Sequence, residues 1–209
     1  MKKLSEAFQH NTSYYRDQLA DMNFSSIKDT LGLGADEGVF SLTFFNRIYA
    51  IAPTGIWDAE GNPADYMALV ILSKYLMLCP ETPVTDMAWA AFKDFRKSAQ
   101  FVNVNYFASD TERAMVPVLS KRLDDVRALC HRVGGQPSTE PFAYDLVLEF
   151  QALPKISLLL LFNEGDADFP AYGTVLFQRH AEDYLDPESL AVTSAYLVRR
   201  LTEALEGER

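Results

Sequence analysis

The sequence lacks the features that mark membrane-spanning and zinc proteins. Its apolar runs are short, as in Leu158–Phe162, and a spanning helix needs roughly 18 apolar residues. It contains 2 cysteines and 3 histidines, and neither residue type occurs in a CxxC or HExxH spacing. The nucleotide-loop pattern GxxxxGK[ST] and the hydrolase pattern GxSxG are also missing. The sequence therefore predicts no cofactor held by the chain itself.

Positive charge is also scarce. Lys and Arg total 19 against 29 Asp and Glu, which gives a net charge of -10. A field of this sign opposes binding to nucleic acid or to an anionic membrane, so neither is an expected partner. The basic stretches Lys93–Lys97 and Arg199–Arg200 are interpreted as solvated helix faces. The stretch MKKLSEAFQHN has no apolar core of the kind found in export signals, and a cytoplasmic location is expected.

The two cysteines, Cys79 and Cys130, are far apart in the sequence. Each follows or lies within an apolar, helix-like segment. Because free cysteine behaves as a small apolar residue, both are predicted to be buried, reduced thiols.

The first half of the chain predicts an amphipathic helix, a loop, a hairpin and a buried helix. Apolar residues spaced by three and four predict a helix that ends near Leu19. The segment Gly32–Gly38 is expected to be a flexible loop. The β-branched and aromatic segment Val39–Ala52 predicts a hairpin that reverses at Asn46-Arg47. The signal Asn62-Pro63-Ala64-Asp65 predicts the start of a helix that is apolar on nearly every side, from Tyr66 to Leu78.

The second half predicts a short helical segment, a long helix, an antiparallel meander and a last helix. Trp89, Phe92, Phe95 and Arg96 stand at helical spacing. A capping box at Ser109 and Glu112 predicts a long helix that ends before Gly134. AYDLVLEFQAL alternates with a period of two, ISLLLLF is continuously apolar, and GTVLF follows a polar turn. Asp186-Pro187-Glu188 predicts the cap of the last helix.

These patterns together predict a single α+β domain over residues 1–209. Its expected centre is an antiparallel sheet of about five strands packed with several helices. The middle strand of the meander should be covered on both faces, because its apolar run shows no alternation.

Three acidic residues at the turn after ISLLLLF form the first candidate site. Glu164, Asp166 and Asp168 are carboxylates, the ligands that hard cations such as calcium prefer. The spacing of an EF-hand is absent, and water screens the repulsion among acids at an exposed turn. The favoured interpretation is a solvated turn, with a metal site as the alternative.

The second candidate site is a set of possible ligand-binding residues. Asp145 and Glu149 lie on the more polar face of the predicted strand, about 13 Å apart at the rise of an extended chain, which is too far for a paired-carboxylate mechanism. Each would need a partner from elsewhere to act as an acid or base. Trp89 and Arg96, on the short helical segment predicted after Pro83, complete this set.

Several segments resemble an uncharacterised bacterial and archaeal family, domain of unknown function 3786. The segments are ALPKI, SLLLLF, GDADFPA and YLDPESLA within Phe150–Ala191, FFNRIYAI from Phe44 and WAAFKDF from Trp89. The resemblance covers residues 40–205 approximately and leaves residues 1–38 as an additional helix and loop. It implies no assigned activity. Family members are typical of anaerobes, and some resemble fusions to a cysteine-rich iron-sulfur module of the corrinoid type. This chain lacks those cysteines, so any cluster would belong to a partner.

Three functional hypotheses remain open at this point. The first is a non-enzymatic accessory or binding module that serves anaerobic metal or corrinoid metabolism, with an iron-sulfur or corrinoid protein as its partner. The second is an enzyme or small-ligand binder that uses the candidate carboxylates. The third is a structural homodimer formed through the exposed edge of the hairpin or through the last helix.

Overall fold

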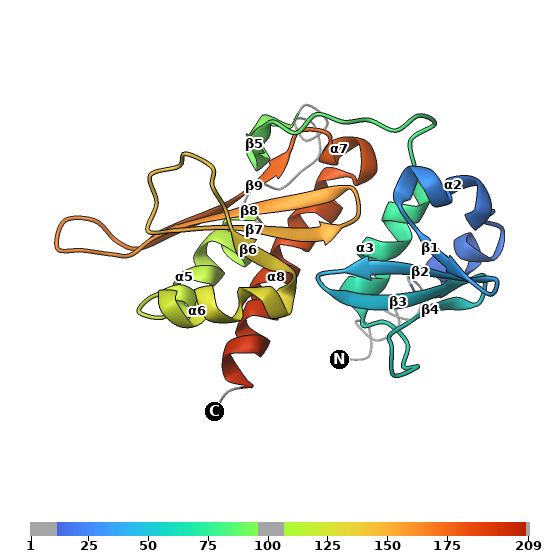
Figure 1. Ribbon diagram of the computed structural model, residues 1–209, viewed down its shortest axis with the longest axis horizontal. Helices are drawn as coiled ribbons and strands as arrows, with labels where there is room; N and C mark the ends of the chain where they lie inside the picture. Colours follow the sequence, from blue (N-terminus) through green and yellow to red (C-terminus); the bar gives the residue numbers. More distant parts are fainter. Residues whose placement is uncertain (1–11, 96–106, 208–209) are drawn as a thin grey trace.

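The computed structural model describes residues 12–95 and 107–207, which form an α+β structure with two antiparallel sheets (Figure 1). The first sheet has the order β1-β2-β3-β4 and the second has the order β5-β9-β8-β7-β6. The strands of the first sheet are β1 (Gly34–Asp36), β2 (Val39–Phe44), β3 (Arg47–Ala52) and β4 (Gly55–Trp57). The strands of the second sheet are β5 (Trp89–Ala91), β6 (Gly135–Pro137), β7 (Leu146–Leu153), β8 (Ile156–Asn163) and β9 (Tyr172–Gln178).

Helices pack against both sheets. Residues 12–20 are helical, and the longer helices after them are α2 (Phe24–Leu31), α3 (Tyr66–Met77) and α8 (Pro187–Glu206). The shorter helical segments are η1 (Phe92–Asp94), η3 (Ala108–Arg113), α5 (Ala114–Leu119), α6 (Leu123–Leu129), η4 (Cys130–Val133) and α7 (Ala181–Tyr184). No helix in the described part of the chain is both long enough and apolar enough to cross a membrane.

The first sheet differs from the sequence prediction at two turns. The segment predicted as a flexible loop contains β1, which pairs with β2 through a turn at Glu37-Gly38, where both residues have positive φ. The hairpin of β2 and β3 is confirmed, but it reverses at Phe45-Asn46, one residue earlier than predicted. Phe45 has φ 45°, a conformation that bulky residues rarely adopt. Its side chain is fully buried, so tertiary packing overrides the local preference.

The predicted hairpin edge is not free. β1 pairs with β2 on one side of the hairpin and β4 pairs with β3 on the other. The edge strands of both sheets, β1, β4, β5 and β6, each have three residues. Short edge strands offer few backbone groups for pairing with another chain. The hairpin edge that the sequence predicted to be exposed is therefore paired on both sides, and dimerisation of the chain stays a prediction.

The meander of β7, β8 and β9 is confirmed. Leu158–Phe162 is buried throughout β8, and Pro154-Lys155 forms the turn before it. The aromatic segment at Trp89 is not the helix predicted from its spacing. It forms β5, which pairs with β9, followed by the single turn η1. The helical spacing gave a wrong prediction because the aromatic side chains of this segment pack around Phe177 from a turn that follows the short strand, and not from one face of a helix.

The long helix predicted before Gly134 is broken. Pro117 lies inside α5 and cannot donate a hydrogen bond to the preceding turn. The helix stops at Ser120, and Lys121 has φ 62° before α6 begins. Gly134 ends the last turn in the left-handed conformation, as predicted. The part of the predicted amino-terminal helix within residues 1–11, and Arg96 of the helical segment predicted at Trp89, lie outside the described residues.

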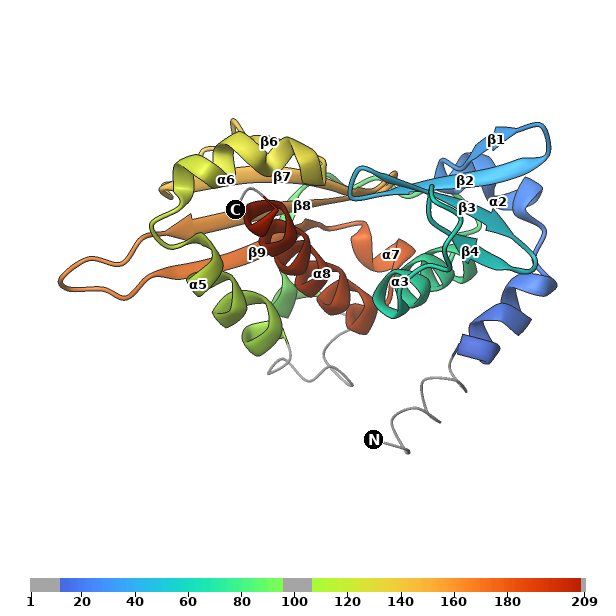
Figure 2. The same cartoon turned by 90° about the horizontal axis from the view of Figure 1, so that it is seen from below.

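The two sheets form a single compact body with one hydrophobic cluster. The β2–β3 turn joins them, because the Phe45 backbone N–H donates to the Ala152 carbonyl of β7 at 3.0 Å. The Phe45 ring stacks on Tyr196 of α8, with ring centroids 5.8 Å apart. α8 contacts α3 beside the first sheet and α5, α6 and η4 beside the second (Figure 2). The inward face predicted for this helix is buried, at Leu190, Ser194, Leu197, Leu201 and Leu205.

The two cysteines are free thiols. Cys130 is buried as predicted, whereas Cys79 is only partly buried. Burial raises the pKa of both thiols, which lowers their reactivity. His180 is buried, and its two ring nitrogens contact the backbone of Asp86 and Lys155. Its position indicates a structural role.

Candidate functional site

The acidic turn between β8 and β9 projects from the second sheet (Figure 1). Two of the predicted site residues meet at its base, where Asp145 Oδ2 accepts a hydrogen bond from the Glu164 backbone N–H at 2.8 Å. The Glu164 side chain accepts one from the Lys121 backbone N–H at 2.6 Å. Glu164 thereby satisfies a donor at the break between α5 and α6. These contacts stabilise loops and need no ligand.

The tip of this turn is closed by Asp166. Its Oδ1 accepts hydrogen bonds from the backbone N–H groups of Asp168, at 2.8 Å, and of Phe169, at 2.7 Å. These two bonds lower the pKa of this fully exposed carboxyl. Among the described residues, no group of three or more His, Cys, Asp and Glu side chains is placed to hold a metal ion. The Asp166 carboxylate thus serves the backbone of the turn itself, and both the solvated turn and the metal site stay predictions.

The remaining predicted site residues do not converge. Glu149 is half-buried on β7, opposite Leu159. Trp89 is half-buried on the edge strand β5, opposite Gln178. Arg96 lies outside the described residues. The two cavities described below are lined by other residues.

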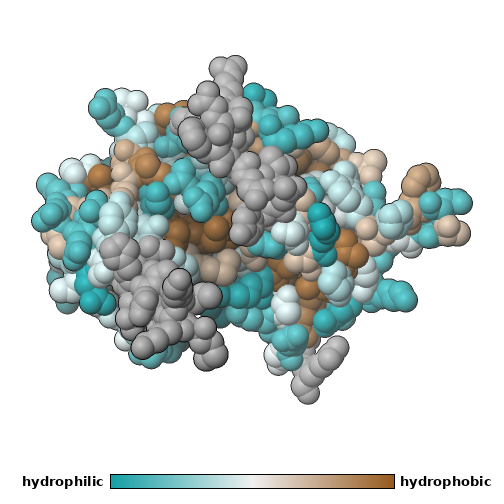
Figure 3. Space-filling view, turned by 180° about the vertical axis from the view of Figure 1, so that it is seen from behind, coloured by the Kyte–Doolittle hydropathy of each residue, from teal (hydrophilic) through white to brown (hydrophobic). Residues whose placement is uncertain are grey.

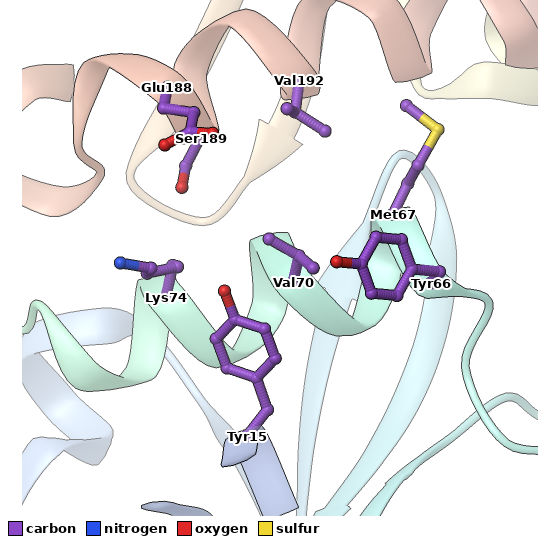
Figure 4. Close-up of a pocket in the computed structure, with 8 residues that line it drawn as sticks. All are labelled: Tyr15, Tyr66, Met67, Val70, Lys74, Glu188, Ser189 and Val192. Atoms are coloured by element: carbon purple, nitrogen blue, oxygen red, sulfur yellow. The ribbon is translucent and has the colours of Figure 1, made fainter. Parts of the chain in front are cut away.

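A different site lies where α3 and α8 run side by side in opposite directions. An ion pair joins the helices at each end of this contact, Lys74 with Asp186 and Asp65 with Arg199. Between the two pairs is a cavity of about 260 Å³, which we call the α3–α8 cavity (Figure 4). Its lining residues come from residues 12–20, α3 and α8: Tyr15, Tyr66, Met67, Val70, Lys74, Glu188, Ser189 and Val192.

At the Lys74 end of this cavity, the opposite charges of Lys74 and Asp186 stabilise each other. Lys74 Nζ lies 3.1 Å from Asp186 Oδ2. Burial raises the pKa of Asp186, but hydrogen bonds from Ser189 and the ion pair with Lys74 outweigh it, and the net pKa is lowered. For Lys74, the same pair outweighs desolvation and raises the pKa. Asp186 also caps α8 through the Ser189 backbone N–H, as the sequence predicted.

The ion pair of Lys74 and Asp186 predicts that the stability of the protein depends on pH. Asp186→Asn should remove this contribution to the dependence. The folded pKa of Asp186 lies below its ordinary value of 3.8, so its contribution to stability is complete above that pH and is lost as the pH falls through the folded pKa. The stability difference between wild type and Asp186→Asn, measured by urea unfolding, should shrink as the pH falls below 3.8. Asp124→Asn is the control, because its side chain is 99% exposed and its ion pair contributes about 0–1 kcal/mol. Equal behaviour of the two variants would contradict the prediction.

A second polar cluster lies at the Asp65 end. Asp65 Oδ1 caps α3 by accepting a hydrogen bond from the Ala68 backbone N–H, so the cap is the last residue of the start signal predicted from the sequence. Asp65 Oδ2 accepts from Arg199 at 2.6 Å and from the Tyr196 hydroxyl at 3.3 Å. The Tyr196 hydroxyl lies 3.4 Å from that of Tyr49 on β3. Burial, followed by the bond to Tyr196, raises the pKa of Tyr49 far above its ordinary value.

A larger cavity, which we call the β3 cavity, opens beside this cluster and measures about 710 Å³. It is lined by the start of β3 and by the loop before α3: Asn46, Arg47, Ile48, Tyr49, Asp58, Ala59, Glu60, Asn62, Pro63, Ala64 and Asp65. Asp58 accepts hydrogen bonds from the backbone of Glu60 and Asn62, which shapes the loop.

Sequence reasoning did not identify either cavity. Arg199 and Arg200 were interpreted as a solvated face, but Arg200 is 6% exposed and Arg199 is held by Asp65. That interpretation is therefore wrong for Arg200, whereas Arg199 is partly exposed. The sequence signal for their burial is the strongly apolar sequence around these two arginines on α8. A positively charged side chain on a buried helix needs partners of opposite charge or hydrogen-bond acceptors.

The fold and the two cavities define a class of protein: an α+β body of two antiparallel sheets joined along α3 and α8, with concave sites beside that contact. The chain matches the family described as a domain of unknown function, DUF3786, over residues 23–200, and it belongs to that family. The match begins earlier than the sequence reasoning placed it, so α2 and β1 are part of the family region. No curated protein and no solved structure matches the chain.

Proposed function

We propose that the chain is a non-enzymatic accessory or binding module of the cytoplasm, and that its α3–α8 cavity receives an apolar side chain of a partner protein. The observation that carries this proposal is the floor of the cavity. Met67, Val70 and Val192 are apolar, line the cavity and are only half-buried. Burying them against a partner would release about 25 cal/mol for each Å² of apolar surface.

The size of the cavity favours a protein side chain, and not a cofactor, as its occupant. Its volume is about 260 Å³, below the range of about 300–1,000 Å³ that is typical of small-molecule sites. A corrinoid is far larger than this space. A cofactor involved in the pathway would therefore stay on the partner.

The rim of the cavity supplies polar contacts around this floor. Lys74 is paired with Asp186, while Glu188 is exposed at the start of α8. Seen from behind, the molecule shows some apolar surface near its middle, while much of the remaining coloured surface is polar (Figure 3). Apolar surface inside a polar rim is a common feature of interaction sites. Glu188 favours a partner segment that carries a basic residue beside its apolar one.

The family resemblance suggests the class of partner. Since related chains resemble fusions to iron-sulfur modules of the corrinoid type and this chain lacks their cysteines, we propose an iron-sulfur or corrinoid protein of anaerobic metabolism. The experiment is anaerobic capture on the immobilised chain, followed by mass spectrometry and by the absorption spectrum of the captured protein. We expect the wild-type chain to retain such a protein.

Val70→Glu tests whether the cavity does the binding. A charge on the cavity floor should reduce retention of the partner by about tenfold or more, because burying an unpaired charge is strongly unfavourable. Ile48→Glu is the matched control, because Ile48 is 60% exposed on β3 and lies outside the α3–α8 cavity. Circular dichroism should show that both variants are folded. Retention by Val70→Glu at the wild-type level would refute the site, and capture of no metal or corrinoid protein would refute the partner class.

A further inference from the structure

Three arginines surround one glutamate at the far end of α8. Glu203 lies 3.5 Å from Arg47, 3.5 Å from Arg199 and 3.4 Å from Arg200. With Asp65, which pairs with Arg199, the five groups carry three positive charges and two negative ones. The cluster therefore has a net positive charge in a chain whose net charge is -10.

The Glu203 carboxylate does not satisfy all the hydrogen-bond donors of the arginines that surround it. Charge-assisted hydrogen bonds between these groups normally measure about 2.7–2.9 Å, and all three contacts to Glu203 are longer. The buried atoms Arg199 Nε, Arg200 Nε and Arg200 Nη1 have no hydrogen-bond acceptor among the residues that the structure describes. Arg200 is 6% exposed, and a buried donor without an acceptor is costly.

We propose that this cluster is a binding site for a phosphate group, and that the group displaces the Glu203 side chain when it binds. A phosphate has more acceptor oxygens than a carboxylate and a charge of about -1.5 to -2 near neutral pH, so it suits three guanidinium groups that share the Glu203 carboxylate, of which Arg199 alone also has a bond to Asp65 among the contacts described above. The Glu203 side chain is 45% exposed, which leaves it free to move toward solvent. Arginine is well suited to phosphate because its donors form a planar fork.

The β3 cavity provides the approach to this site. Arg47 lines that cavity and also contacts Glu203, so a ligand in the cavity reaches the cluster at Arg47. The volume of about 710 Å³ would hold the organic part of a small phosphomonoester. Three acidic residues line the cavity as well, Asp58, Glu60 and Asp65. They disfavour a phosphate away from Arg47, the basic residue of this lining.

The test measures binding of inorganic phosphate and of phenyl phosphate by calorimetry, with chloride at equal ionic strength as the reference. Glu203→Ala and Glu203→Gln remove the competing carboxylate, and each should bind phosphate about tenfold more tightly than wild type. Arg47→Gln should bind it about tenfold more weakly, the size of effect expected from one charge-assisted contact of about 1.4 kcal/mol. Tighter binding of phenyl phosphate would assign the site to a phosphomonoester, and equal binding would assign it to free phosphate.

The matched control is the exposed pair of Arg179 and Asp86, whose side chains are 53% and 49% exposed. The corresponding pair of Arg47 and Glu203 is 48% and 45% exposed. Arg179→Gln and Asp86→Ala change the net charge in the same way and should leave phosphate binding unchanged. The proposal is overturned if Glu203→Ala and Asp86→Ala have equal effects, or if Arg47→Gln retains wild-type affinity. Partner capture at the α3–α8 cavity does not depend on this outcome.

Discussion

Leu160→Ala is expected to lower the free energy of unfolding by about 2–5 kcal/mol. Leu160 is completely buried in β8, the central strand of the second sheet. It stands opposite Leu148 on β7 and Val175 on β9, so these neighbours hold the surrounding structure in place. A cavity at this position cannot collapse easily, and the cost should lie well above that of a surface substitution. Urea unfolding followed by circular dichroism measures it.

Ile48→Ala is the control for this substitution, since it also truncates an aliphatic residue in a strand. Ile48 is 60% exposed, and surface substitutions of this kind usually change stability by about 0.5 kcal/mol or less. If the two substitutions were equally destabilising, Leu160 could not be packed in the core as the structure places it. The slope of the free energy of unfolding against urea concentration, the m-value, should be the same in both variants as in the wild type.

Asp65→Ala is expected to lower the free energy of unfolding by about 2 kcal/mol, of which the lost cap of α3 accounts for about 1 kcal/mol. The remainder comes from Arg199 and the Tyr196 hydroxyl, which lose their common acceptor. The Asp65 side chain is 39% exposed, so water limits the cost of the broken ion pair. Thermal and urea unfolding measure this effect.

Two further variants separate these contributions. Asp65→Asn keeps an oxygen for the cap and removes the charge, so it should cost less than Asp65→Ala. In a double-mutant cycle, Asp65→Ala and Tyr196→Phe should show a coupling energy above about 0.5 kcal/mol, as expected for residues in one hydrogen-bond network. Additive effects would show that the bond between these two side chains contributes no stability.

The local patterns of the sequence predicted those elements whose cause is local. The period of two in β7 and the unbroken apolar run of β8 gave the meander, because the face that a strand buries fixes its side-chain pattern. Asp186-Pro187 gave the start of α8, because a cap and a proline satisfy the first backbone donors of a helix. The helix predicted from the aromatic spacing at Trp89 was wrong, because rings at this spacing can also pack from a short strand followed by a turn.

The candidate sites depended on tertiary structure. The acidic turn stood out in the sequence, but two of its three carboxylates, those of Glu164 and Asp166, accept backbone hydrogen bonds within loops. Arg47, Asp65 and Arg200 are far apart in the chain and had no shared motif. They lie in one cluster only because the β2–β3 turn and the start of α3 both pack against α8.

The sequence by itself determined the α+β class, the central meander, the buried character of α3 and the family to which the chain belongs. The tertiary structure alone decided the division into two sheets, the α3–α8 cavity and the pairing of the arginines. The physical reason is one of range. Hydrophobic periodicity reflects which face of a local element is buried, whereas a cavity or a charge cluster depends on how distant segments of the chain approach one another.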